Sequence, residues 1–137
     1  MKNLLSILRA MQIHYHTMHW KSHGQNFYGD HIMYERIYKS LKKDIDECGE
    51  KSIALFGDNS IDEVELAQMI LSWIIRWNST NEHDKAVMPE VDLQNVAKQT
   101  FDQLSSANNL SMGLNDFLMT ICNKHETDLY LIKQRFS

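Results

Sequence analysis

The sequence contains few of the residues that interrupt helices or cross-link a chain. Among its 137 residues are one proline, five glycines and two cysteines, and short alternating runs rich in Val and Thr are nearly absent. Cys48 and Cys122 lie among apolar neighbours in helix-like stretches. We therefore expect reduced, buried thiols and not the disulfide framework of a small secreted domain.

Positive charge and long apolar runs are also scarce. The formal net charge of -4 gives no electrostatic reason to expect nucleic acid or an anionic membrane as a partner. The most apolar stretch, residues 69–75, is interrupted by Ser72 and is much too short to span a bilayer. The first residues lack the apolar core and cleavage site of a signal peptide. We expect a soluble, cytoplasmic protein with a single domain over residues 1–137.

Helical periodicity runs through the whole chain. Gly57 is expected to end the second helix, Ser60-Ile61-Asp62-Glu63 is a capping box for the third, and residues 79–84 are a polar loop. Four long helices and one connecting helix predict a bundle with one crossover. The connecting helix is apolar on more than one side, so we expect a neighbouring subunit against it. The predicted helices cover residues 4–24, 29–55, 61–77, 90–105 and 113–136.

The second helix carries two pairs of metal-ligand residues, His31 with Glu35 and Asp46 with Glu50, each four positions apart. All four side chains fall within an arc of about 100°, away from the apolar face. The centres of the pairs are about 22 Å apart along the helix, too far to share one metal ion within a chain. Two antiparallel copies across a two-fold axis would join the pairs at two shared sites. Alternatively, these are solvated charges paired with lysines on the same helix.

The surrounding residues carry a more specific pattern. His19-Trp20 precedes His31 by twelve positions, Gly24 and Asn26-Phe27 follow, and Glu50 is succeeded by Lys51. Over residues 4–55 this resembles the signature of the Dps family of mini-ferritins, although Glu35 stands where that family usually has Asp and Lys21 where it commonly has Asn. The resemblance implies an all-α, ferritin-like four-helix bundle with a short extra helix in the crossover between the second and third long helices.

The resemblance also implies a ferroxidase centre that two subunits share. One subunit would supply His19, His31 and Glu35, and its mate Asp46 and Glu50. Such a centre oxidises Fe(II) with hydrogen peroxide or dioxygen, for iron storage and protection from oxidative damage; Zn and Mn are alternative ions for these ligands. The implied assembly is a homo-oligomer, at least a two-fold dimer and in the family commonly a dodecamer. DNA binding is not expected, because the chain has no basic tail.

Two other functions stay open from the sequence. One is a non-catalytic assembly protein that keeps the metal site for dimer stability, and the other is a mononuclear metalloenzyme that uses His16, His19 and His23. No Glu is followed three residues later by His, which argues against the intrasubunit di-iron site of larger ferritins.

The remaining histidines and aromatic residues are expected to play supporting roles. We expect His14 to be a hydrogen-bonded structural residue, and His16 and His23 to lie beside the ligands. His83 and His125 are expected to be structural or solvent-exposed. Trp20 and Tyr38 are packing residues, with electron donation as their alternative role beside an iron centre.

Overall fold

The computed structural model describes all 137 residues and contains five α-helices, one 3-10 turn and no strand, which confirms the all-helical prediction. None of the helices combines the length and hydropathy that a membrane span requires. The elements are α1 (Lys2–Lys21), α2 (Phe27–Phe56), the 3-10 turn (Asp58–Ser60), α3 (Glu63–Asn78), α4 (Glu82–Ser106) and α5 (Met112–Arg135).

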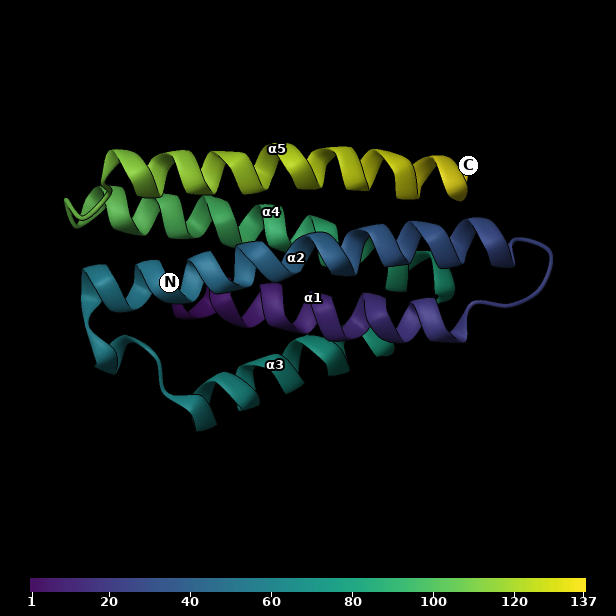
Figure 1. The fold of residues 1–137 in the computed structure, drawn as a ribbon, viewed down its shortest axis with the longest axis horizontal. Coiled ribbons are helices and arrows are strands. Elements are labelled where there is room, and N and C mark those ends of the chain that lie inside the picture. Colours follow the sequence, from purple (N-terminus) through teal and green to yellow (C-terminus); the bar gives the residue numbers. More distant parts are fainter.

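The four longest helices, α1, α2, α4 and α5, lie side by side along the long axis, and α3 crosses beneath α1 (Figure 1). Helix α2 returns antiparallel to α1, and α5 returns antiparallel to α4. Helices α2 and α4 run in the same direction, so the chain between them must travel the length of the bundle. Helix α3 spans this crossover and packs against α1 and α4, as the sequence predicts for its connecting helix.

The apolar faces expected on the first two long helices form much of the core. Leu8 and Met11 of α1 are fully buried, as are Leu41 and Cys48 of α2. Both cysteines are free; Cys48 is buried and Cys122 is partly exposed. Since these residues recur at three- and four-residue steps, burying one face of each helix leaves the opposite face of α2 free for polar side chains.

The start of α4 differs from the prediction. The sequence predicts a loop over residues 79–84 and a helix that begins after Pro89, but α4 begins at Glu82 and Pro89 lies inside it. The Asn81 side chain caps the helix by accepting a hydrogen bond from the Asp84 amide, at 2.9 Å. Pro89 has no N–H to donate to the Lys85 carbonyl, and His14 Nε2 donates to that oxygen instead, at 2.7 Å. The hydrogen-bonded, structural role expected of His14 is confirmed.

Helix α3 also departs from the prediction in its cap and its orientation. Asp62, and not Ser60, is the N-cap, with its carboxylate 2.8 Å from the Glu65 amide. Trp73 packs against the chain's own core and donates to Ser6 Oγ at 3.1 Å. The large apolar side chains that α3 leaves exposed are Val64, Leu71 and Ile75.

Candidate metal centre

Two histidine rings meet where α1 ends and α2 begins. His19 lies in the last turn of α1 and His31 near the start of α2, and their rings stack with centroids 3.7 Å apart and planes inclined by 23°. The short link between the helices turns at Gly24, whose φ of +80° is a conformation that other residues rarely adopt. The predicted ligands His19, His31 and Glu35 each offer a donor atom within 4.8 Å of the other two.

Reciprocal backbone hydrogen bonds fix both rings. His19 Nδ1 lies 2.8 Å from the His31 carbonyl oxygen, and His31 Nδ1 lies 3.0 Å from the His19 carbonyl oxygen. A carbonyl can only accept, so each Nδ1 carries the proton, and in the neutral ring each Nε2 keeps its lone pair. This is the tautomer in which imidazole ligates a metal while its other nitrogen is held by a hydrogen bond.

Glu35 is the third donor of this group and forms an ion pair with Lys39, one turn further along α2. The Lys39 ammonium holds the pKa of the Glu35 carboxyl below its usual value. Glu35 is therefore charged over a wide pH range, but its carboxylate must be shared with Lys39 or released by it before it can ligate an ion.

Aromatic side chains surround one side of the histidine pair. The His16 ring lies 3.9 Å from that of Trp20 and 4.0 Å from that of Tyr38, between centroids. His16 is therefore a packing neighbour of His19, with ring centroids 6.1 Å apart. His23 is exposed and donates to the Lys21 carbonyl, so the structure does not bring His16, His19 and His23 together as one set of ligands.

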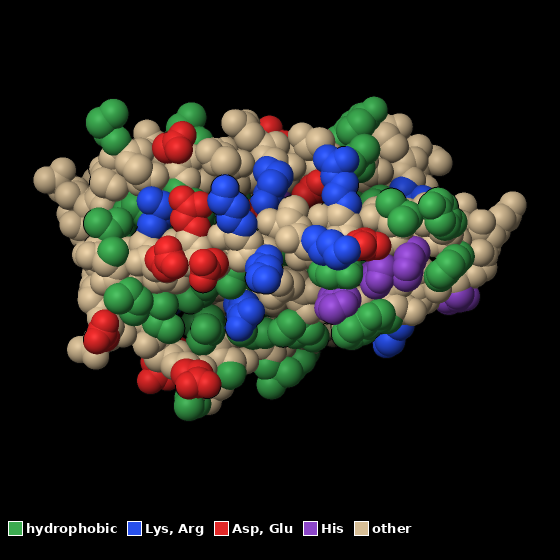
Figure 2. All heavy atoms as spheres, viewed as in Figure 1, with side chains coloured by type: hydrophobic (Ala, Val, Ile, Leu, Met, Phe, Trp, Pro, Cys, Tyr) green, Lys and Arg blue, Asp and Glu red, His purple; other side chains and the backbone are tan.

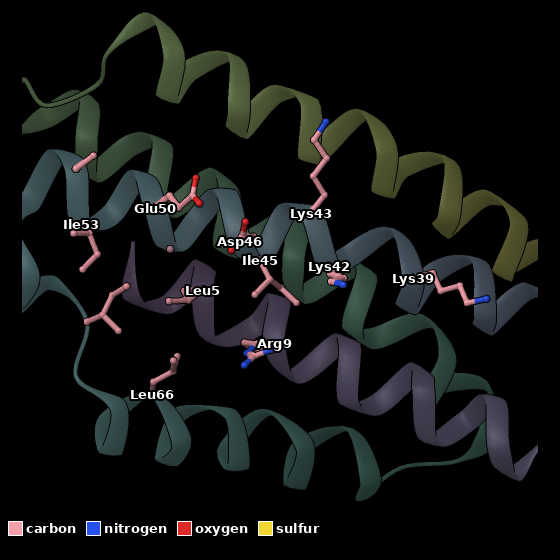
Figure 3. A pocket seen from close by; sticks show the side chains of 13 residues that line it. Leu5, Arg9, Lys39, Lys42, Lys43, Ile45, Asp46, Glu50, Ile53 and Leu66 are labelled. Atoms are coloured by element: carbon pink, nitrogen blue, oxygen red, sulfur yellow. The ribbon is translucent and has the colours of Figure 1, made fainter.

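Asp46 and Glu50 lie elsewhere on the same helix. Both are exposed and line an open groove between α1, α2 and α3 (Figure 3). Arg9 and Lys42 line the same groove. On this face of the molecule, histidine side chains gather toward one end, and most acidic side chains lie toward the other end or the middle (Figure 2). Within one chain, Asp46 and Glu50 therefore do not join the histidine pair, as the length of α2 requires.

A second group of residues with metal-ligand side chains lies in the bundle interior, where no site is predicted from the sequence. Glu90 of α4 and His125 of α5 are fully buried, and Asp128 is nearly so. His125 Nδ1 lies 2.7 Å from Glu90 Oε2 and 3.7 Å from Asp128 Oδ2. Burial raises the pKa of both Glu90 and Asp128, because the low-dielectric interior disfavours their charged forms.

The signal for this interior group was weak but present in the sequence. His125 and Asp128 are three positions apart and so share one face of α5, whereas Glu90 comes from a different helix. The Glu-x-x-His motif of larger ferritins places the acid before the histidine, whereas here His125 precedes Asp128. His83, by contrast, is more than half exposed and packs on Phe136, within the role expected for it.

No protein-family model matches the sequence, and no curated protein or solved structure matches it. Inference about function therefore rests on the two groups of candidate metal ligands, His19, His31 and Glu35 at the surface and Glu90, His125 and Asp128 in the interior.

Proposed function

We propose that this chain is a mini-ferritin of the Dps type, which folds as a ferritin-like bundle and oxidises Fe(II) at a centre shared by two subunits in the cytoplasm. The observation that carries this proposal is the pair of imidazoles, His19 and His31, which are fixed through Nδ1 and offer donor atoms within 4.8 Å of the Glu35 carboxylate. Two imidazoles and a carboxylate suit Fe(II), which is the substrate here.

The group is only half of an oxidising site. Three protein ligands leave coordination positions open, and a ferric product is better stabilised by further carboxylates. Asp46 and Glu50 are the carboxylates on the same face of α2, but they lie about 22 Å away along the helix. A second copy of the chain, antiparallel across a two-fold axis, brings its own Asp46 and Glu50 to the histidine pair.

The α2 face has features suited to such a pairing. Ile53 falls within the arc of the four ligand positions and is more than a third exposed. Lys39 and Lys42 lie on the same face, so their ammonium groups can offset the carboxylates that the second copy adds. We extend the proposal to a closed shell, for which the exposed apolar row of Val64, Leu71 and Ile75 on α3 offers a further contact surface.

The proposed reaction balances with hydrogen peroxide as the oxidant. Two Fe(II) ions each give one electron, and the peroxide takes both electrons and two protons to form two molecules of water. The histidines favour loading of the ferrous ion, and the carboxylates favour the ferric product that moves into the shell. Trp20 and Tyr38 pack around His16 beside the site, where either ring can supply an electron to a stray radical.

The second candidate is a metal-binding assembly protein without oxidase activity. The Glu35–Lys39 ion pair favours it, because this pair occupies the third ligand. In that case metal would strengthen the dimer but iron would not turn over.

Ferrous oxidation separates the two candidates. Fe(II) is added under nitrogen, peroxide is injected, and the ferric absorbance is followed. We expect the His31→Ala variant to lose at least about tenfold in rate, because a direct ligand is removed. His23→Ala is the matched control, since that exposed ring joins neither group. A wild-type rate no faster than buffer would overturn the ferroxidase proposal, and metal-dependent dimerisation in the same sample would support the assembly protein.

A further inference from the structure

We infer that the bundle interior holds a second metal site, in which Glu90, His125 and Asp128 bind one divalent transition-metal ion within a single chain. This site is separate from the shared surface centre and needs no partner subunit. Each of the three residues offers a donor atom within 4.8 Å of the other two. Only small side-chain movements are needed to place such atoms around one ion with bonds of about 2.0–2.2 Å.

Unpartnered polar atoms carry the inference. Glu90 Oε1, His125 Nε2 and Asp128 Oδ2 are buried and have no hydrogen-bond partner. Buried polar groups are nearly always hydrogen-bonded, and an unsatisfied one is strongly destabilising. Three such atoms in one cluster indicate that a component of the native site satisfies them.

No protonation state of His125 satisfies the cluster. With the proton on Nδ1, the ring donates to Glu90 Oε2, but Nε2 and Asp128 Oδ2 stay unpartnered. With the proton on Nε2, Nδ1 can accept a hydrogen bond only from a protonated Glu90, and Nε2–H has no partner within hydrogen-bonding distance. With both protons, Nε2–H has only Asp44 Oδ2, at 4.0 Å, beyond hydrogen-bonding distance. A cation bound between the ring and the two carboxylates would interact with the oxygens of both Glu90 and Asp128, whereas a single proton on the ring can serve only one of them.

The geometry points to Nδ1 as the ligand atom of His125. Both carboxylates approach the ring on its Nδ1 side, at 2.7 and 3.7 Å. Asp44 of α2 lies on the other side, toward Nε2. A ligating histidine commonly donates its second N–H to a carboxylate, which fixes the ring and raises its basicity. Here the 4.0 Å between Nε2 and Asp44 Oδ2 must shorten by a small movement when the ion binds, so that Nε2–H gains this partner.

Two basic side chains adjoin the buried cluster and reach solvent. The Arg36 guanidinium is 4.0 Å from Asp128, and its side chain is mostly exposed. Lys124 forms an ion pair with Asp44 and is about one-third exposed. Arg36 of α2 and Lys124 of α5 are therefore the partly exposed groups that adjoin the buried cluster. One imidazole and two carboxylates suit Mn(II), Fe(II), Co(II) or Zn(II) better than thiol-seeking ions.

The test uses the full-length chain with both surface histidines replaced, His19→Ala and His31→Ala, so that only the interior site can bind. The metal-stripped protein is titrated with Co(II), whose visible spectrum reports coordination by nitrogen and oxygen, and with Zn(II) in equilibrium dialysis. We expect one ion per chain and a higher midpoint of thermal unfolding with metal. Adding Glu90→Gln or Asp128→Asn, which preserve side-chain shape, should weaken binding at least about tenfold.

Glu126→Gln is the matched control, because Glu126 is the exposed neighbour of His125. It should bind metal as the background protein does. If the background protein retains no metal, or if Glu90→Gln and Glu126→Gln bind equally, the cluster is a buried ion pair or a water site and the inference is wrong. Because the surface centre is absent from every sample, this result is independent of the ferroxidase assay.

Discussion

The two groups of candidate metal ligands hold their histidine rings with different hydrogen-bond partners. His19 and His31, between α1 and α2, have each Nδ1 held by a backbone carbonyl and each Nε2 left free near the surface. His125, between α4 and α5, is held by a buried carboxylate and is surrounded by polar atoms without partners. In the first cluster both ring N–H groups have partners without an ion, and the proposed further carboxylates come from a second chain, whereas all of the proposed ligands of the second cluster lie in one chain.

Backbone carbonyls can orient two histidine rings as a pair of metal ligands without any charged side chain beside them. A ring whose Nδ1–H donates to a backbone carbonyl is oriented by a neutral hydrogen-bond partner, and its Nε2 stays available as a ligand. A ring that donates to a buried carboxylate depends on neighbouring charges, because the interior does not screen them. Loss of a side chain should therefore affect the two regions very differently.

The largest contrast should appear in the stability of the metal-free protein. His125→Ala leaves Glu90 and Asp128 facing each other in the interior, and we expect it to lower the free energy of unfolding by about 3–5 kcal/mol. His31→Ala removes one hydrogen bond at a partly exposed position and should lower it by only about 0.5–1.5 kcal/mol. Urea unfolding in chelator, at matched protein concentrations, measures both values. Equal losses would contradict the contrast.

Assembly should matter for the surface cluster alone. Ile53→Glu places a third carboxylate beside Asp46 and Glu50 on the proposed dimer face, and we expect it to weaken association at least about tenfold. Light scattering should show a monomer, and ferrous oxidation should fall with it, while the interior site keeps its metal. Met119→Glu, at an exposed position on α5, is the control and should leave the dimer intact. A monomeric wild type at micromolar concentration would exclude the dimer.

The smallest effect concerns the Glu35–Lys39 pair at the rim of the surface cluster. Lys39 lowers the pKa of Glu35, so Lys39→Met should let that carboxyl protonate at higher pH. A carboxyl with a lowered folded pKa adds stability above its unfolded pKa and loses it as pH falls through the folded pKa. The variant lacks Lys39 and should therefore lack that contribution, so its stability should fall less than that of wild type as pH is lowered through the carboxyl range. NMR titration of the Glu35 side-chain carbon follows this shift, and an unchanged pKa would show that the ion pair does not form.

Sequence patterns predicted what lies along single helices. The extents of α2 and α5 follow closely from apolar periodicity and, for α2, from the stop at Gly57, whereas the Ser111 cap of α5 was not predicted. His31 and Glu35 are one turn apart on α2, and the motif with His19-Trp20 added the third ligand. All three lie together in the structure.

Contacts between distant segments could not be predicted in this way. A proline inside α4 is tolerated because His14, 71 positions before Lys85 in the chain, donates to the Lys85 carbonyl in place of the missing proline N–H. Likewise, Glu90 meets His125 only because α4 and α5 pack antiparallel. Spacing within one helix does not contain this information, since it arises from how the bundle closes.

Mixed dimers test the shared centre most directly. One variant carries His31→Ala and Glu35→Ala, the other Asp46→Ala and Glu50→Ala, and each alone should oxidise iron poorly because both of its sites are damaged. A dimer of the two variants places both lesions in one site and leaves the other site intact. Co-refolded mixtures should therefore regain part of the wild-type rate with peroxide. If mixed dimers form, as native mass spectrometry can verify, and no activity returns, Asp46 and Glu50 do not act on the histidine pair of a second chain.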